Sequence, residues 1–91
     1  MSTKEKIVEE VAIDELLGNQ NVIVLFNDDV NTFDHVIDTL VVVCDHDPIQ
    51  AEQCAFIIHY KGKCEIKSGP MKELIPMCTK LLDAGLSAEI H

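Results

Sequence analysis

The chain has 91 residues and a formal net charge of −9, which bounds it to one domain with a modest hydrophobic core. The acidic balance argues against nucleic acid and anionic membranes as partners, because both require clustered Lys and Arg, and it favours basic or ammonium-bearing partners. There is no Trp and little Phe or Tyr, so Val, Ile and Leu must form most of the core. No apolar run approaches the roughly 18 residues that a membrane span needs.

The first twenty residues differ from the rest in composition. The stretch 2–20 is rich in Lys and Glu and ends in Gly18-Asn19-Gln20, which predicts a flexible tail over 1–20 and a folded domain over 21–91. It lacks the apolar core region of a secretory signal, so we expect a cytoplasmic protein. The cysteines form no CxxC pair and are expected to be reduced thiols. They are Cys44, Cys54, Cys64 and Cys78.

The apolar run Val22–Phe26 predicts a buried first strand, over about Asn21–Asn27. The run ends at Asn27-Asp28-Asp29, three polar residues that favour a turn over continued sheet. A helix should begin within a few residues, so the strand end presents an amide oxygen and two carboxylates beside the apolar face of that helix. Such a site suits a cation with an apolar group next to it, as in a peptide N-terminus with a large first side chain.

The first helix is predicted over about Thr32–Cys44, with Asn31 as its N-cap and Asp34 at its third position. Its apolar residues recur at the spacing of one helix face. Because Val42 and Val43 extend the apolar surface around the helix, we expect this helix to lie at the centre of the fold.

The second helix is predicted from its caps. Asp45-His46-Asp47 breaks the first helix, and Asp47 with Pro48 suits the N-cap and first position of a new one. Gly62 suits its C-terminal end. The buried face is expected to consist of four small or apolar residues, Ala51, Cys54, Ala55 and Ile58.

Three further elements complete the chain. Lys63–Ser68 alternates and predicts a second strand. After the turn at Ser68-Gly69-Pro70, Met71–Ala84 is expected to be a helix although Pro76 lies inside it, and Leu86–Ile90 predicts a third strand. The fold class is therefore α+β, a small βααβαβ sandwich in which three helices lie on one face of a three-stranded antiparallel sheet.

His59 is expected at the end of the second helix, which must return toward the sheet edge where the first strand ends. A neutral imidazole offers one acceptor nitrogen. Together with the amide oxygen of Asn27 and a carboxylate of Asp29, it makes three acceptors, and an ammonium group has three donors. The plainer alternative is a half-buried histidine that is satisfied by a backbone carbonyl.

Two stretches together resemble the ClpS family, the N-degron adaptors of the Clp protease. One is Val24-Leu25-Phe26-Asn27-Asp28-Asp29, followed by Phe33 and Val36-Ile37, and the other is Ile58-His59-Tyr60-Lys61-Gly62-Lys63. The resemblance covers residues 22–63 well and the final third of the chain weakly. The family fold has the same βααβαβ order that the sequence pattern predicts.

The resemblance implies a non-enzymatic adaptor that uses no cofactor and no metal. ClpS adaptors bind the free α-amino group and the large apolar first side chain (Phe, Tyr, Trp or Leu) of N-degron substrates. They deliver these substrates to an AAA+ unfoldase, ClpA or a ClpC relative, that feeds the ClpP peptidase. By position, the implied amine-binding residues are Asn27, Asp28, Asp29 and His59, and the implied pocket residues are Asn31, Phe33, Val36, Ala55, Ile58 and Leu86.

The chain departs from the family pattern in two regions. Phe33 and Ala55 stand where the family commonly has two Met residues, which should change the shape of the pocket more than its volume. The stretch Cys64–Leu86 is shorter than usual, so the residues that contact the unfoldase are harder to match. The candidates are Glu73 for the acid and Lys72 as its neighbour.

Two other functions, metal binding and general protein interaction, stay open at this point. No cysteine is bracketed by turn glycines or an oxyanion-hole pattern, so we expect no enzyme activity. His35, His46 and their flanking Asp residues could hold a metal, although zinc ligands usually come in pairs at short regular spacing. A general interaction module of the same fold, such as a ribosomal-stalk-like domain, would have no need of the clustered acceptors.

Overall fold

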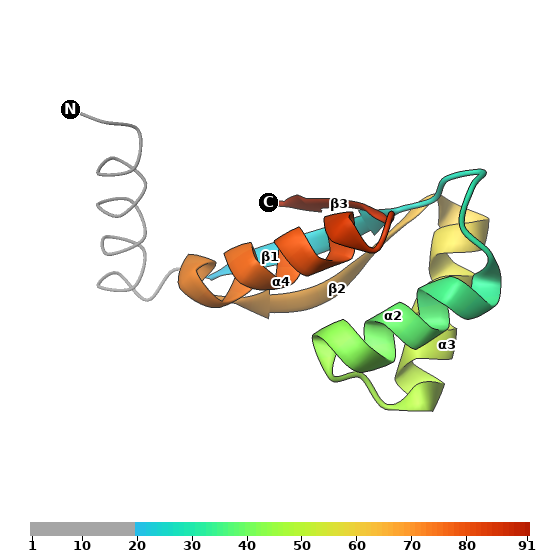
Figure 1. The fold of residues 1–91 in the computed structure, drawn as a ribbon, viewed down its shortest axis with the longest axis horizontal. Coiled ribbons are helices and arrows are strands. Elements are labelled where there is room, and N and C mark those ends of the chain that lie inside the picture. Colours follow the sequence, from blue (N-terminus) through green and yellow to red (C-terminus); the bar gives the residue numbers. More distant parts are fainter. Residues whose placement is uncertain (1–19) are drawn as a thin grey trace.

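The computed structural model describes residues 20–91, so the predicted tail lies outside the described residues apart from Gln20. Six elements follow one another in the predicted order (Figure 1). The strands are β1 (Asn21–Phe26), β2 (Lys63–Gly69) and β3 (Ser87–Ile90), and the helices are α2 (Phe33–Cys44), α3 (Pro48–Lys61) and α4 (Met71–Asp83). Within the described residues, no helix is long and apolar enough to cross a membrane.

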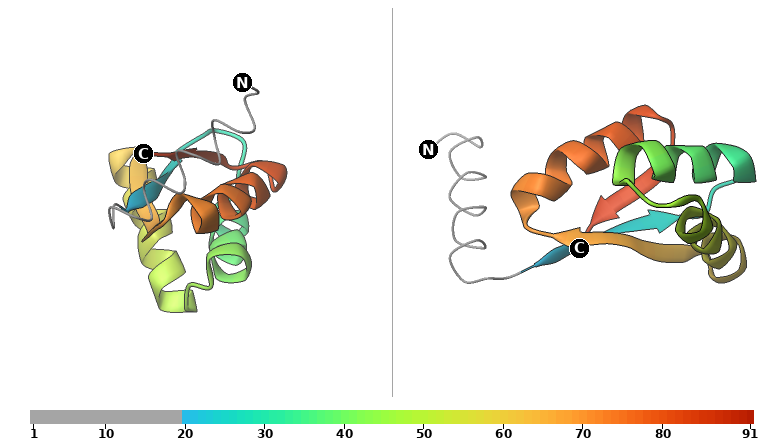
Figure 2. Two further views of the ribbon diagram at one scale, coloured as in Figure 1. Left: turned by 90° about the vertical axis from the view of Figure 1, so that its left-hand side faces the viewer. Right: turned by 90° about the horizontal axis from the view of Figure 1, so that it is seen from below.

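The three strands form one antiparallel sheet in the order β2-β1-β3, with the helices gathered on one side of it (Figure 2). This confirms the predicted α+β sandwich. β1 is the central strand, and its residues Ile23 and Leu25 are 0% and 1% exposed because they face the helices. The central position of β1 fixes the place from which the following loop departs.

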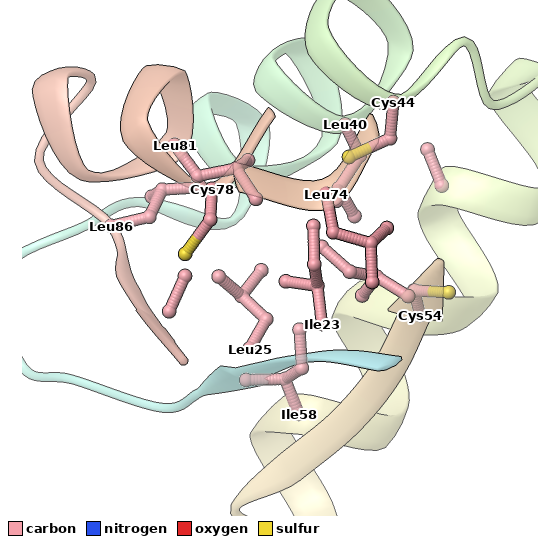
Figure 3. Close-up of a cluster of buried hydrophobic side chains, with 13 residues drawn as sticks. Ile23, Leu25, Leu40, Cys44, Cys54, Ile58, Leu74, Cys78, Leu81 and Leu86 are labelled. Atoms are coloured by element: carbon pink, nitrogen blue, oxygen red, sulfur yellow. The ribbon is translucent and has the colours of Figure 1, made fainter. Parts of the chain in front are cut away.

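The core lies between the sheet and the helices (Figure 3). Leu40 from α2 and Leu74 and Leu81 from α4 meet the β1 side chains there and are almost completely buried. Aliphatic side chains dominate this cluster, as the composition predicts. Burial of each such side chain contributes about 1.5–3 kcal/mol relative to exposure.

The start of α2 differs from its prediction by one residue. Thr32, not Asn31, is the N-cap, and its hydroxyl accepts a hydrogen bond from the backbone N–H of His35 at 3.1 Å. The expectation that α2 lies at the centre is also wrong, because Val42 is 82% exposed. The run of apolar residues is longer than the face that the fold covers.

Helix α3 agrees with its prediction in detail. Asp47 caps it by accepting from the backbone N–H of Gln50, and Pro48 is the first helical residue. Gly62 ends it at a φ of 90°, in the left-handed region that glycine adopts without a steric penalty. The buried residues are the four that the spacing predicts, Ala51, Cys54, Ala55 and Ile58.

Helix α4 continues through Pro76. A proline inside a helix removes one backbone hydrogen bond and costs about 3 kcal/mol or more. Pro76 lies on the exposed side of the helix, while Leu74, Cys78 and Leu81 are buried against the sheet. Tertiary packing therefore holds α4 together despite an unfavourable residue in its interior.

A buried histidine joins the helical layer to an irregularity in β2. Ile23 pairs with Lys67 and Val24 with Glu65, so Ile66 has no partner residue on β1 and forms a bulge. The ring of His46, in the α2–α3 loop, is 5% exposed, and its Nε2–H donates to the carbonyl oxygen of Ile66 at 2.7 Å. The carbonyl can only accept, so Nε2 carries the proton, and the buried Nδ1 has no hydrogen-bond partner among the described residues.

We expect His46→Ala to destabilise the fold, because it leaves the Ile66 carbonyl oxygen buried without a donor. An unsatisfied buried acceptor costs about 1–3 kcal/mol, and the loss of the ring adds a cavity. Urea denaturation measures the free energy of unfolding. The exposed His91 is a matched control, and His91→Ala should change stability by no more than about 0.5 kcal/mol. A His46→Leu variant as stable as the wild type would show that the hydrogen bond contributes nothing.

Candidate functional site

The loop between β1 and α2 is organised by the side chain of Asp28. Its Oδ1 accepts from the backbone N–H groups of Val30 at 3.0 Å and Asn31 at 2.8 Å, which is an Asx turn. These bonds favour the charged carboxylate, and the hydrogen bond from the Asn31 backbone is the largest cause of a pKa below the usual value of Asp28. Asp28 therefore shapes the loop from within.

The turn between α4 and β3 braces this loop from outside. The side-chain nitrogen Nδ2 of Asn31 donates to Oδ2 of Asp28 and to the carbonyl oxygen of Gly85, both at 2.8 Å. Ser87 Oγ donates to the same Asp28 oxygen at 3.4 Å. From α2, His35 Nε2 donates to the carbonyl of Ala84 at 2.9 Å. Asn31 is not the helix cap because its side chain makes these hydrogen bonds to Asp28 and Gly85.

A backbone hydrogen bond joins the end of α3 to the start of the loop. The backbone N–H of Asn27 donates to the carbonyl of Gly62 at 2.8 Å. Gly62 itself donates to the carbonyl of Ile58, which closes the last turn of α3. His59, in that last turn, is thereby held beside the end of β1, as the predicted order of elements requires.

A cavity of about 310 Å³ lies between this loop, α2 and α3. Every residue that lines it is one for which the sequence predicts a site role, while the predicted Leu86 lies beside a smaller void of about 20 Å³ that shares Asn31, Val36 and Ile58 with the cavity. The lining residues are Asn27, Asp28, Asp29, Asn31, Phe33, Val36, Ala55, Ile58 and His59.

The lining is chemically divided. Asn27, Asp29 and His59 are exposed polar residues, whereas Ala55 and Ile58 are 3% and 4% exposed and present an apolar wall. Within residues 20–91, the side chain of Asp29 has no hydrogen-bond partner, so its carboxylate is available to a ligand. The arrangement can hold a group that is cationic at one end and apolar at the other.

Two aromatic residues beside the cavity were not predicted as site residues. Phe33 contacts Phe56 edge to face, with ring centroids 4.9 Å apart, and Phe56 stacks on Tyr60 at 6.3 Å. Phe56 and Tyr60 are four residues apart, which places them on one face of α3. This spacing was visible in the sequence, but their position next to Phe33 depends on how α2 and α3 pack.

The metal-binding alternative finds little support in the histidines. Both His35 and His46 use Nε2 to donate to backbone carbonyls, of Ala84 and Ile66. Across the described part of the chain, no group of three or more His, Cys, Asp or Glu residues is arranged to hold a metal ion.

The cysteines are free thiols in the structure, as predicted. Burial raises the pKa of Cys44 to about 11. Burial, together with the neighbouring Cys54 thiol, raises the pKa of Cys64 to about 12. Both groups are therefore protonated at neutral pH and are poor nucleophiles, because the thiolate is the reactive form.

The predicted docking residues lie away from the cavity. Lys72 and Glu73 are exposed in the first turn of α4, and Figure 1 shows that this turn is at the opposite end of the sheet from the loop between β1 and α2. The structure thus separates the candidate docking surface from the cavity.

Comparison with known proteins agrees with the geometry. The family model described as "ATP-dependent Clp protease adaptor protein ClpS" matches residues 18–89. No curated protein matches the chain at a significant level. Because the family match spans most of the chain, the protein belongs to the ClpS family of Clp protease adaptors, whose members are adaptors and not enzymes.

The depressed pKa of Asp28 makes a prediction about stability and pH. A carboxyl group with a lowered folded-state pKa stabilises the fold above its unfolded value, 3.8, and this contribution is lost as pH falls through the folded value. Asp28→Asn should therefore be less stable than the wild type at pH 7, and the difference should shrink below pH 3.8. Urea denaturation at pH 7 and about pH 3 measures it.

Asp29→Asn is the matched control for that experiment, because the Asp29 side chain accepts no hydrogen bond from residues 20–91. Its stability should follow the wild type at both pH values. A difference between Asp28→Asn and the wild type that stays constant with pH would contradict the assignment of the stabilisation to the Asp28 carboxylate.

Proposed function

We propose that this protein binds the free α-amino group and the large apolar first residue of N-degron substrates and delivers them to a Clp AAA+ unfoldase. The observation that carries the proposal is the divided cavity, which has three acceptors at one end and an apolar wall at the other. The class of adaptor follows from family membership. The chemistry of the lining supports the proposed ligand.

The acceptors match an ammonium group. The amide oxygen of Asn27, the carboxylate of Asp29 and a nitrogen of His59 can accept its three hydrogen bonds. A carboxylate among them supplies the opposite charge, and hydrogen bonds to charged groups are the stronger ones. Asp28 takes part indirectly, because its oxygens already accept from Val30, Asn31 and Ser87.

The apolar end matches one side chain. Small-molecule pockets span roughly 300–1,000 Å³. At about 310 Å³ this cavity is at the lower limit, which suits a single residue and its amine. A large apolar first side chain, such as Phe, Tyr, Trp or Leu, would be buried there against Val36, Ala55 and Ile58.

Delivery requires a second surface. We assign contact with a ClpA- or ClpC-type unfoldase of the ClpP protease to the surface around Glu73 and Lys72, and a role in delivery to the tail at 1–20. The first turn of α4 and the loop between β1 and α2, which lines the cavity, lie at opposite ends of the sheet, so the adaptor can hold substrate and unfoldase at once (Figure 1). Such a protein works in the cytoplasm, where the Clp protease acts.

Peptides that begin with Phe, Tyr, Trp or Leu should bind with a dissociation constant in the micromolar range or tighter, about −8 kcal/mol. Acetylation of the N-terminus removes the ammonium and leaves the acceptors unpaired, which should weaken binding by roughly 2–5 kcal/mol. Fluorescence anisotropy with paired free and acetylated peptides measures both. Equal affinity within each pair would refute the pocket assignment.

The pocket residues Phe33 and Ala55 yield a further prediction. Phe33 and Ala55 both line the cavity, and each replaces a Met of the family pattern. Ala55→Met should overfill the cavity at a cost of about 1–3 kcal/mol, and peptides that begin with Trp should lose the most affinity. Adding Phe33→Ala should restore part of the loss. If the two changes are additive, Phe33 and Ala55 do not share a wall of the pocket.

A further inference from the structure

Four aromatic rings form a continuous arc beside the cavity. Phe33 contacts Phe56 at 4.9 Å, Phe56 stacks on Tyr60 at 6.3 Å, and Tyr60 contacts His59 edge to face at 5.2 Å between centroids. The two end members, Phe33 and His59, line the cavity. The two middle members, Phe56 and Tyr60, lie outside it on α3. The arc therefore begins and ends in the cavity, and its middle lies on the exposed surface of α3.

The middle of the arc is open to solvent. Phe56 is 45% exposed and Tyr60 is 78% exposed, although both rings bear large apolar surfaces. The two ring planes differ by only 9°, so the rings are nearly parallel. Helix spacing accounts for the stacking of this pair, and Phe56 also contacts Phe33 of α2.

Acidic and basic residues both lie near the arc. Glu52 lies one turn before Phe56 on the exposed side of α3, and Asp34 follows Phe33 at the start of α2. Asp29 lies in the cavity itself. Lys61 and Lys63 follow Tyr60 in the sequence, whereas the whole chain carries a formal charge of −9. An aromatic ring face attracts cations, and the acidic balance of the whole chain favours them as partners.

We propose that the exposed pair Phe56 and Tyr60 forms a second subsite, which binds the second side chain of the substrate and prefers arginine there. This rests on the proposed function, because the first residue must occupy the cavity. The neighbouring Cα lies only about 3.8 Å further along the peptide, so the second residue emerges at the rim. The guanidinium stacks on a ring face, and the aliphatic stem of the arginine covers the apolar edge.

The proposal is tested with four peptides that begin with Phe and differ only at the second residue, which is Arg, Ala, Leu or Glu. Fluorescence anisotropy gives each dissociation constant. We expect Arg to bind about 2- to 5-fold tighter than Ala, which is the range of exposed cation–π contacts, and Glu to bind more weakly than Ala. If Leu improves binding as much as Arg, the arc is a general apolar surface and the preference for arginine is refuted.

Two variants test whether the preference for arginine depends on the rings of the arc. Tyr60→Leu and Phe56→Leu keep an apolar side chain but remove the ring face, so the ratio of Arg to Ala affinity should fall toward 1. Ile49→Ala is the matched control, because Ile49 is 70% exposed at the start of the same helix and lies outside the arc. An unchanged ratio in both arc variants would overturn the proposal. Tyr60→Leu is the cleaner variant, because Phe56 also contacts Phe33.

The same measurements distinguish a failure of the proposed subsite from a failure of the proposed function. The peptide with Ala at its second position reports on the pocket alone, and its affinity should fall on N-terminal acetylation in the wild type and in both arc variants. Acetylation-sensitive binding without any difference between Arg and Ala would refute the subsite and leave the proposed function intact. Binding of the Ala peptide that ignores acetylation would refute the proposed function itself.

Discussion

The hydrogen bonds that converge on the Asp28 carboxylate are the constraint on which the site depends. Through Asn31 and Ser87 they join the loop after β1 to the turn before β3, and the bond from Asn27 to Gly62 joins the same loop to the end of α3. A loop of a few polar residues has no core of its own. It keeps one shape because two distant parts of the chain hold it, and that shape leaves the Asp29 side chain without a hydrogen-bond partner among residues 20–91.

Local signals predicted most of the fold. In α3, the cap at Asp47 and the glycine at 62 defined both ends, and one face of small residues identified the buried side. The errors occurred where distant contacts compete with local preference. Asn31 is a good cap by type, but Gly85 and Asp28 take its side chain, and Val42 is apolar in a helix whose partners cover only one face.

The site could be predicted in its residues but not in its supports. The strand end and the order of elements were enough to expect Asn27, Asp29 and His59 together, and the cavity lining contains all three. Nothing local indicates that Ala84 and Gly85 brace the loop, or that His46 bonds to a bulge in β2, because these partners are separated by 20 or more residues. Likewise Phe56 and Tyr60 form a visible helical pair, but only the packing of α2 on α3 extends it to Phe33.

The hydrogen bond from His46 to Ile66 has a consequence for the kinetics of ligand binding in the pocket. It fixes the α2–α3 hairpin to β2, and α2 and α3 are the two walls of the cavity. This hydrogen bond helps to hold the two walls in place, so we expect a largely preformed site. For a preformed site, peptides that differ in affinity differ chiefly in residence time and little in association rate. Under the proposed function, the lifetime of the complex, set by how well a first residue fills the cavity, would decide how long an unfoldase has to take the substrate.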